Sequence, residues 1–322
     1  MTIRGISICL TLFLFGAQVV AQQASQSSGE PTIQQTNNYT VARNTFGQPD
    51  ISGVWQTRFL TNLERTAGVE SLVVDAQQAA SIAAEILASI PHNEDPEIEW
   101  EGVSELALVR GEYRSSLIVD PADGLLPYRE AALPQVEFSS TRYQTQFDHP
   151  EQRPLAERCL GSMGFPPIQS IPVLLPYQIV QTRDQILIFA EGPAGVRIVY
   201  LDSQRKQPVP ASHEGYSTGH WDGDTLVVRT INFRPDMPER SGFGRPMLIS
   251  PDTVIEERFT RLSATELNYF FTVTDAGLYT QPWSGEFSLY AQAGPIYEYA
   301  CHEGNYSLQG ILRGGQLYPE AN

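Results

Sequence analysis

The chain has 322 residues, of which 41% are hydrophobic, so it is long and apolar enough to bury a sizeable core. Its formal net charge of −16 at pH 7 repels nucleic acid and anionic membranes, and no basic stripe offsets that charge. Lys206 is its single lysine and lies in a turn-like stretch, which disfavours chemistry that needs a desolvated lysine amine. We therefore expect a globular protein whose partner is a small-molecule ligand or substrate, with no nucleic-acid partner.

Residues 1–21 have the pattern of a secretory signal peptide. Arg4 supplies a positive charge, an apolar run follows at 8–16, and small residues at 19–21 precede the cleavage site. The apolar run is too short for a stable membrane span, so we expect no membrane insertion and an exported protein, either periplasmic or extracellular. Residues 22–48 are rich in Gln, Ser, Thr and Asn, which predicts a disordered leader.

Residues 49–315 are expected to form a single β-rich domain, followed by a short tail at 316–322. Alternating apolar residues predict a first strand at 51–58. One N-terminal helix follows, with Asp75 as its cap, an apolar stripe along one face and Pro91 as its stop.

Strand-like segments separated by turn residues fill the rest of the domain. A strand begins at residue 116, and a Pro-rich irregular segment runs from 148 to 176. Further strands are predicted at 177–182, 185–190, 197–201, 215–221, 225–231, 254–262, 266–274, 280–290 and 296–301. Consecutive strands without intervening helices predict a mostly β fold, an antiparallel meander that forms a lipocalin-like barrel or a sandwich.

Two cysteines, Cys159 and Cys301, remain once Cys9 leaves with the signal peptide. An exported protein matures in an oxidising compartment, where two thiols are more often bridged than free. We therefore expect a Cys159–Cys301 disulfide, with two free thiols as the alternative.

Several motifs together resemble a large family of exported bacterial proteins of unknown function. They include PYQIVQT at 176–182, GHWDGDTLVV at 219–228 and IYEYACHEGNYSLQGILRG at 296–314. The resemblance covers roughly residues 115–315 in the expected order and places both cysteines inside family motifs, but it implies no common activity. The chain departs from its relatives at Asp222, where they often carry glutamate, and at 191–195, where they often carry longer polar or His-containing segments.

Chemical groups are densest after the last predicted strand, where Cys301, His302, Glu303 and Asn305 lie close together. If the strand ends at Cys301 and the chain then turns, His302 and Glu303 can reach one ligand. His302 would act as a general acid or base near neutral pH, oriented by Glu303. The alternative is structural, with Glu303 as a cap of the turn or of a short helix at 307–312, and His302 at the surface.

His220 is a second candidate catalytic residue, because it precedes Trp221, a predicted core side chain, and can face a cavity. A purely structural role is the alternative and is favoured, because a lone histidine is more often structural than functional. The neighbouring Asp222 and Asp224 are better explained as residues of a hairpin turn, because two carboxylates are too few for a calcium site.

Strand alternation within 254–262 turns Glu257 inward with the apolar residues and Arg258 outward. A buried carboxylate must be paired or protonated, and Arg197 is the candidate partner. Glu257 is therefore a candidate acid–base group, with an internal salt bridge as the equally weighted alternative. Arg197 and Arg258 are candidates for stabilising negative charge on a substrate.

Tyrosine and tryptophan are plentiful, and a wall of them suits a flat apolar or phenolic ligand. The candidate ligand-binding aromatic residues are Tyr216, Trp221, Trp283 and Tyr299, although strands also use such residues simply to pack. The chain contains no phosphate loop, His-Glu-x-x-His or Cys-x-x-Cys motif, so no cofactor and no metal site is predicted.

Two functions remain open on these grounds. The first is an exported, cofactor-independent acid–base enzyme, a lyase, isomerase or hydrolase, that acts on a small apolar or aromatic compound in a barrel cavity. The second is a non-catalytic exported protein that binds such a compound. The enzyme is slightly favoured because titratable groups are expected to converge, and the oligomeric state stays open.

Overall fold

The computed structural model describes residues 39–89, 103–155, 157–160, 164–168, 176–192, 195–201, 209–236, 239–240 and 245–317. The predicted signal peptide, most of the predicted leader and most of the predicted tail lie outside these residues. Contacts between residues place Gln35–Asn322 in one compact unit.

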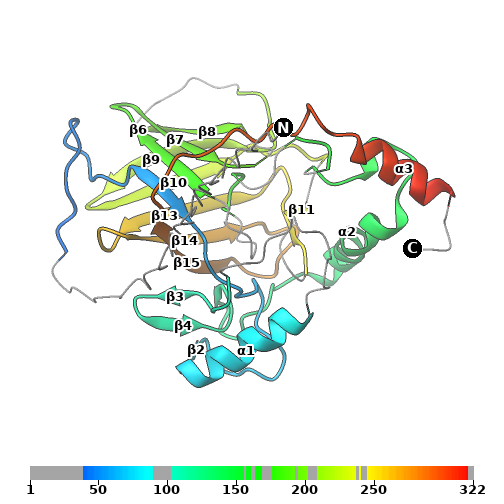
Figure 1. Ribbon diagram of the computed structural model, residues 1–322, viewed down its shortest axis with the longest axis horizontal. Helices are drawn as coiled ribbons and strands as arrows, with labels where there is room; N and C mark the ends of the chain where they lie inside the picture. Colours follow the sequence, from blue (N-terminus) through cyan, green and yellow to red (C-terminus); the bar gives the residue numbers. More distant parts are fainter. Residues whose placement is uncertain are drawn as a thin grey trace, which may run out of the picture. The chain divides into compact units, whose positions relative to one another are not determined.

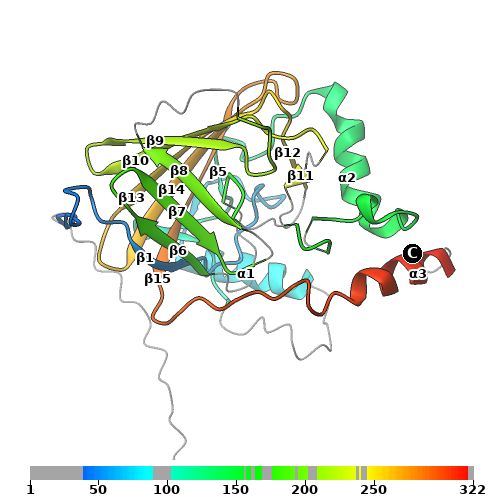
Figure 2. The ribbon, with the colours of Figure 1, turned by 90° about the horizontal axis from the view of Figure 1, so that it is seen from above.

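Nine strands close into a β-barrel, which confirms the mostly β fold predicted from sequence (Figures 1 and 2). Around the barrel the order is β1 (Gly53–Gln56), β6 (Pro176–Gln181), β7 (Gln185–Ala190), β8 (Val196–Leu201), β9 (Tyr216–Asp222), β10 (Thr225–Ile231), β13 (Val254–Arg261), β14 (Glu266–Thr274) and β15 (Trp283–Ala291). The short β1 closes the ring, because it pairs with β6 and also with the end of β15, where Gln56 is opposite Tyr290. A further strand, β5 (Ile118–Asp120), pairs with the beginning of β15.

One strand pair departs from the predicted antiparallel meander, because β8 and β9 run parallel. Parallel neighbours need a long connection that returns the chain to its starting end, and residues 202–215 supply that length. The other neighbouring pairs of the barrel are antiparallel. In the β9–β10 hairpin, Gly223 has a φ of 61°, the left-handed conformation that this tight turn requires.

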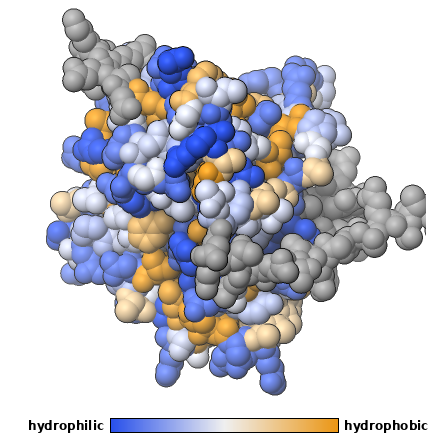
Figure 3. All heavy atoms as spheres, turned by 90° about the vertical axis from the view of Figure 1, so that its left-hand side faces the viewer, coloured by the Kyte–Doolittle hydropathy of each residue, from blue (hydrophilic) through white to orange (hydrophobic). Residues whose placement is uncertain are grey.

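Large side chains occupy the barrel interior. Trp55, Tyr177, Tyr269 and Phe287 are each at most 1% exposed. A barrel of about eight strands is just wide enough for side chains to fill, so such residues form a core. On the face shown in Figure 3, hydrophobic residues form separate patches between hydrophilic ones, as is usual for a surface exposed to water.

Helix α1 (Ala76–Ser89) begins where its cap was predicted. Asp75 Oδ1 accepts a hydrogen bond from the Gln78 backbone N–H at 2.8 Å, and Gln78 Oε1 accepts one from the Asp75 N–H at 3.4 Å. The buried face of α1 forms a small second core with Val74 and Tyr113. These residues belong to a three-stranded sheet outside the barrel, formed by β2 (Val73–Val74), β4 (Glu112–Arg114) and β3 (Leu108–Val109) (Figure 1).

The predicted N-terminal helix is confirmed as α1, and the described residues form two further helices, α2 (Leu133–Thr145) and α3 (Ser307–Leu317), the second of which begins where a short helix was considered as an alternative. The buried positions of α2 include Ser139 and Arg142, so its sequence lacks the continuous apolar stripe that marked α1. No residue of α3 is buried. The remaining short elements are η1 (Glu130–Ala132), η2 (Pro150–Gln152), β11 (Glu239–Arg240) and β12 (Met247–Leu248).

Residues 39–48, at the end of the segment expected to be disordered, pack against the barrel. The Asn44 N–H donates to the Gln48 carbonyl at 2.9 Å, and Arg43 pairs with Asp224 of the β9–β10 turn at 2.6 Å. The folded part of the chain therefore begins before residue 49.

Candidate functional site

A buried polar network inside the barrel joins Arg197 on β8, Glu257 on β13 and Tyr269 on β14. Arg197 Nη1 donates to Glu257 Oε1 at 2.9 Å, and Nη2 contacts Oε2 of the same carboxylate. The Tyr269 hydroxyl donates to Glu257 Oε1 at 2.7 Å. Arg197 also donates to the hydroxyls of Ser217 and Thr230, at 3.1 and 3.0 Å. The predicted inward orientation of Glu257 and its pairing with Arg197 are both confirmed.

Burial dominates the electrostatics of this network, since Arg197 is 2% exposed and Glu257 is 0% exposed. Burial lowers the pKa of Arg197, but the Glu257 carboxylate outweighs that effect, and the pKa of Arg197 lies above its ordinary value. Burial, with Glu257 beside it, raises the pKa of Tyr269 well above 10.0, so the phenol remains a donor. The guanidinium and the phenol thus engage both oxygens of Glu257, as in a structural ion pair.

Glu214 is a further titratable group beside Arg197, and it lies in the loop before β9. Its side chain is half-buried, and burial raises the pKa of its carboxyl while Arg197 partly offsets the rise. The Pro-rich segment lies against the same network, because the Ile168 N–H donates to the Tyr269 hydroxyl at 2.8 Å. The sequence did not point to Glu214, because a carboxylate in a loop carries no periodicity that would reveal its burial.

Residues 215–219 have the Gly-x-Ser-x-Gly spacing of the nucleophile elbow in many hydrolases, a match that the sequence-based prediction overlooked. That elbow is a sharp turn between a strand and a helix, whereas Ser217 lies within β9. Ser217 is 3% exposed, and its hydroxyl lies 2.8 Å from that of Thr230 in addition to its bond with Arg197. Ser217 therefore belongs to the buried network and lacks the exposed setting of a nucleophile.

His302 and Glu303 lie on an exposed turn outside the barrel. The strand predicted at 296–301 does not form, because β1 already pairs with the end of β15 and closes the edge that this strand would need. The chain instead leaves the barrel after Gln292, whose N–H donates to the Val54 carbonyl at 2.9 Å. Glu257 is enclosed in the barrel, so the structure does not bring His302 and Glu303 to a common cavity with it.

His220 is exposed on the outer face of β9, whereas the neighbouring Gly219 is buried and Trp221 packs against the core. The expectation that His220 faces a cavity is therefore wrong, because strand alternation turns it outward. Arg258 also faces outward, as predicted, and forms a surface ion pair with Asp222 at 2.8 Å.

The predicted ligand-binding aromatic residues lie in different surroundings. Trp283 is 0% exposed and belongs to the core. Tyr216 is 8% exposed, and its ring centroid lies 5.6 Å from that of Tyr200. Tyr299, by contrast, is 54% exposed on the segment that follows β15.

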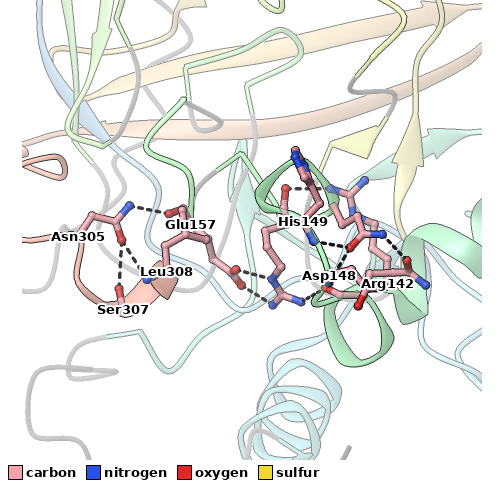
Figure 4. Close-up of polar contacts among 10 residues, drawn as sticks. Arg142, Asp148, His149, Glu157, Asn305, Ser307 and Leu308 are labelled. Atoms are coloured by element: carbon pink, nitrogen blue, oxygen red, sulfur yellow. Dashed lines mark hydrogen bonds and ion pairs between the residues drawn. The ribbon is translucent and has the colours of Figure 1, made fainter. Parts of the chain in front are cut away.

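A disulfide and a polar network hold the C-terminal segment. Figure 4 shows the polar contacts around Glu157 and Asn305. Cys159 and Cys301 are bonded, as predicted. Next to this bond, Asn305 Nδ2 donates to the Glu157 carbonyl at 2.8 Å. The Glu157 carboxylate accepts from Arg153 Nε and Nη2 at 2.8 and 3.0 Å, which ties the loop after η2 together. The segment before Cys301 is therefore fixed at its C-terminal end.

A pocket of about 430 Å³ lies between the outer wall of the barrel and this C-terminal segment. Gln178 of β6 and Phe189 of β7, which are opposite each other in the strand pair, line it from the barrel side. The other lining residues are Gly192, Ile296, Tyr297, Glu298 and Tyr299. The segment that contributes four of them runs along the outside of the barrel from β15 towards α3 (Figures 1 and 2). Pockets for small molecules have volumes of roughly 300–1,000 Å³, so this one has a suitable size.

One hydrogen bond attaches the pocket-lining segment to the barrel between its two ends. The Tyr297 N–H donates to Glu191 Oε2 at 3.0 Å, and Glu191 directly follows β7. The segment is thus held at Gln292, at Tyr297 and at Cys301, which gives the pocket a defined outer wall.

Comparison of this chain with protein-family models, curated proteins and solved structures found no match. The family resemblance of its motifs therefore stays a prediction. Among the described residues, no group of three or more His, Cys, Asp or Glu side chains is placed to hold a metal ion. Within the same residues, no helix has the length and apolar character needed to cross a membrane.

Of the residues singled out from sequence, Tyr299 is the one that lines the pocket. The partners Gln178, Phe189 and Glu298 were missed. Phe189 could have been recognised, because alternation in QILIFA turns Ile188 and Ala190 inward and leaves an aromatic ring on the outer face. The role of residues 296–299, the covering segment, could not have been recognised, because the path of this segment depends on how the barrel closes.

Proposed function

We propose that this protein works outside the cytoplasm as a non-catalytic binding protein for a small aromatic compound. The pocket between β6, β7 and residues 296–299 carries this proposal. Phe189, Tyr297 and Tyr299 supply flat apolar surfaces for stacking, and the amide of Gln178 supplies hydrogen-bonding groups that orient a ligand. Aromatic walls with a few polar groups are the usual lining of small-molecule sites.

Two observations support action outside the cytoplasm. The Cys159–Cys301 disulfide is typical of an oxidising compartment. The pattern of residues 1–21 predicts export through a signal peptide.

The composition of the pocket favours non-catalytic ligand binding over catalysis. Glu298 is the single carboxylate among the described residues that line it, and neither His302 nor Glu257 is one of these residues. General acid–base catalysis needs a proton donor and acceptor within hydrogen-bond reach of the reacting atoms. The lining residues that the structure describes include no histidine and no carboxylate other than Glu298.

A ligand panel tests the proposal. The purified protein is titrated with neutral aromatic compounds, and binding is followed by calorimetry and by the rise in melting temperature, since a ligand at 100 times its Kd stabilises by about 2.7 kcal/mol. Replacing Tyr299 or Phe189 with alanine should weaken binding by about tenfold or more, which is the loss of one aromatic contact of ~1.4 kcal/mol.

Tyr306→Ala is the matched control, because Tyr306 is 81% exposed on the same segment and does not line the pocket. Equal binding by the Tyr299→Ala, Phe189→Ala and Tyr306→Ala variants would show that the ligand does not use this pocket.

The acid–base enzyme remains a second candidate, favoured by the raised pKa of the half-buried Glu214 carboxyl beside Arg197. The same panel is therefore analysed for products. Turnover that is lost in both Glu214→Gln and Glu257→Gln, with the fold intact, would support the enzyme. Compounds that bind and are recovered unchanged support the binding protein.

A further inference from the structure

The charge of the pocket indicates which charge its aromatic ligand carries. Among the described residues that line it, Glu298 is the only one with an acidic side chain, and none is Lys or Arg. A second carboxylate, that of Glu191, lies at the rim, because Glu191 precedes the lining residue Gly192 and accepts the Tyr297 N–H at 3.0 Å. The whole chain adds a formal net charge of −16. A cation would be attracted to this pocket and an anion repelled.

The aromatic residues of the pocket favour the same sign of charge. The faces of phenol and phenyl rings are electron-rich and attract organic cations placed within about 6 Å of the ring centre. Phe189 offers such a ring from the barrel wall, and Tyr297 and Tyr299 offer two more from the covering segment. Tyr297 and Tyr299 are 68% and 54% exposed, so their rings do not pack in the core and remain accessible to a ligand.

We propose that the ligand of this pocket is a small organic cation, an aromatic or alkyl ammonium compound. Its ammonium group lies among the rings of Phe189, Tyr297 and Tyr299 and pairs with Glu298, and its apolar part fills the remaining volume. The inference rests on the proposed binding function, and it adds a requirement for positive charge that the function alone does not make.

Three ligands of matched size and different charge test the requirement. Benzylammonium, benzyl alcohol and benzoate each carry one phenyl ring on one short polar group, with charges of plus one, zero and minus one near neutral pH. Binding to the full-length mature protein is measured by calorimetry at low salt and again at high salt. Benzylammonium should bind about tenfold or more tightly than benzyl alcohol, its affinity should fall as salt rises, and benzoate should be the weakest.

Two variants, each lacking one carboxylate, test whether Glu298 causes the preference for a positively charged ligand. Glu298→Gln should reduce the preference for benzylammonium over benzyl alcohol several-fold. Glu256→Gln is the control, because Glu256 is an exposed carboxylate on the outer face of β13 and does not line the pocket. Both substitutions are at exposed positions and remove one negative charge from the chain, so they separate a local effect from a change in net charge.

The outcomes distinguish this inference from the proposed function. Equal affinity for benzylammonium and benzyl alcohol, lost in Tyr299→Ala, would overturn the charge requirement and leave the aromatic pocket standing. An equal loss of preference in Glu298→Gln and Glu256→Gln would overturn the role of Glu298. Binding by none of the three ligands, nor by the wider panel, would overturn both the proposed function and the inference that depends on it.

Discussion

Replacing Arg197 with methionine should destabilise the barrel severely, because it leaves the Glu257 carboxylate buried without its cation. Arg197 and Glu257 are 2% and 0% exposed, so water does not reach the carboxylate to replace the lost donor. Removing one partner of a buried ion pair costs about 3–5 kcal/mol. The free energy of unfolding of a domain is about 5–15 kcal/mol in total, so this variant should lose a large part of its stability. Methionine keeps an unbranched apolar stem at this position, so the loss contains less of the cost of an empty volume than it would with alanine.

Urea denaturation of the purified variants measures this loss. Arg258→Met is the matched control, because Arg258 directly follows Glu257 on β13 and forms an exposed ion pair. The side chains of that pair, Arg258 and Asp222, are 37% and 63% exposed. An exposed pair of this kind contributes about 0–1 kcal/mol. The double variant Arg197→Met with Glu257→Leu removes both charges, and it should be more stable than the sum of the two single losses predicts, by about 1–3 kcal/mol.

A loss in Arg197→Met no larger than that in Arg258→Met would refute this reasoning. Glu257 would then be able to take up a proton or reach water at little cost. That is the behaviour expected of a catalytic carboxyl, so the same result would strengthen the acid–base hypothesis.

Three further predictions concern the disulfide and the titrating groups. Reducing Cys159–Cys301, or replacing both cysteines with serine, should lower the free energy of unfolding in urea by about 2–5 kcal/mol, because the bond closes a long loop, and a loss under about 1 kcal/mol would contradict this. Burial raises the pKa of Tyr128 to about 12 and that of Tyr279 well above 10.0, so the folded state keeps phenol protons that the unfolded state loses. The melting temperature should therefore fall as the pH rises above 10.0, and a flat profile there would argue against this burial. The raised pKa of Glu214 makes its ionisation unfavourable in the folded state, so stability is lost as the pH rises above the ordinary value of 4.5. Glu214→Gln should melt above the parent protein at neutral pH and at the same temperature below pH 4.5; a lower melting temperature at neutral pH would show that ionised Glu214 stabilises the fold.

Most of the barrel could be predicted from sequence, because apolar and polar residues alternate along each strand and turn residues mark each hairpin. The predicted bounds at 185–190, 225–231 and 266–274 match β7, β10 and β14. Strand neighbours that depend on distant parts of the chain could not be predicted. The parallel pairing of β8 with β9 is one example, since alternation specifies which face a residue occupies and not which strand lies beside it.

The same limit separates the candidate site residues Glu257 and Arg197, which were placed correctly, from His302, which was not. Glu257 and Arg197 were identified because inward alternation on two strands places a carboxylate and a guanidinium in one core, where each requires the other. His302 was misplaced because the alternating pattern at 296–301 resembles a strand, yet β1 occupies the sheet edge that such a strand would need. A pattern with period two indicates an extended segment, and it becomes a strand only where an unpaired edge is available.

Closure of the barrel also explains why the proposed binding site lies outside it. Once β1 and β15 pair, the chain beyond residue 291 has no sheet to join, so its aromatic side chains can contribute only to a surface feature. Glu191 and the disulfide hold that segment over Gln178 and Phe189, where the outer wall of β6 and β7 completes the pocket. The core of the barrel and the pocket therefore share strands but not side chains, because inward residues stabilise the fold and outward residues contact the ligand. Substitutions such as Arg197→Met should then lower stability without a specific effect on binding, whereas Tyr299→Ala should lower affinity and leave the unfolding transition unchanged.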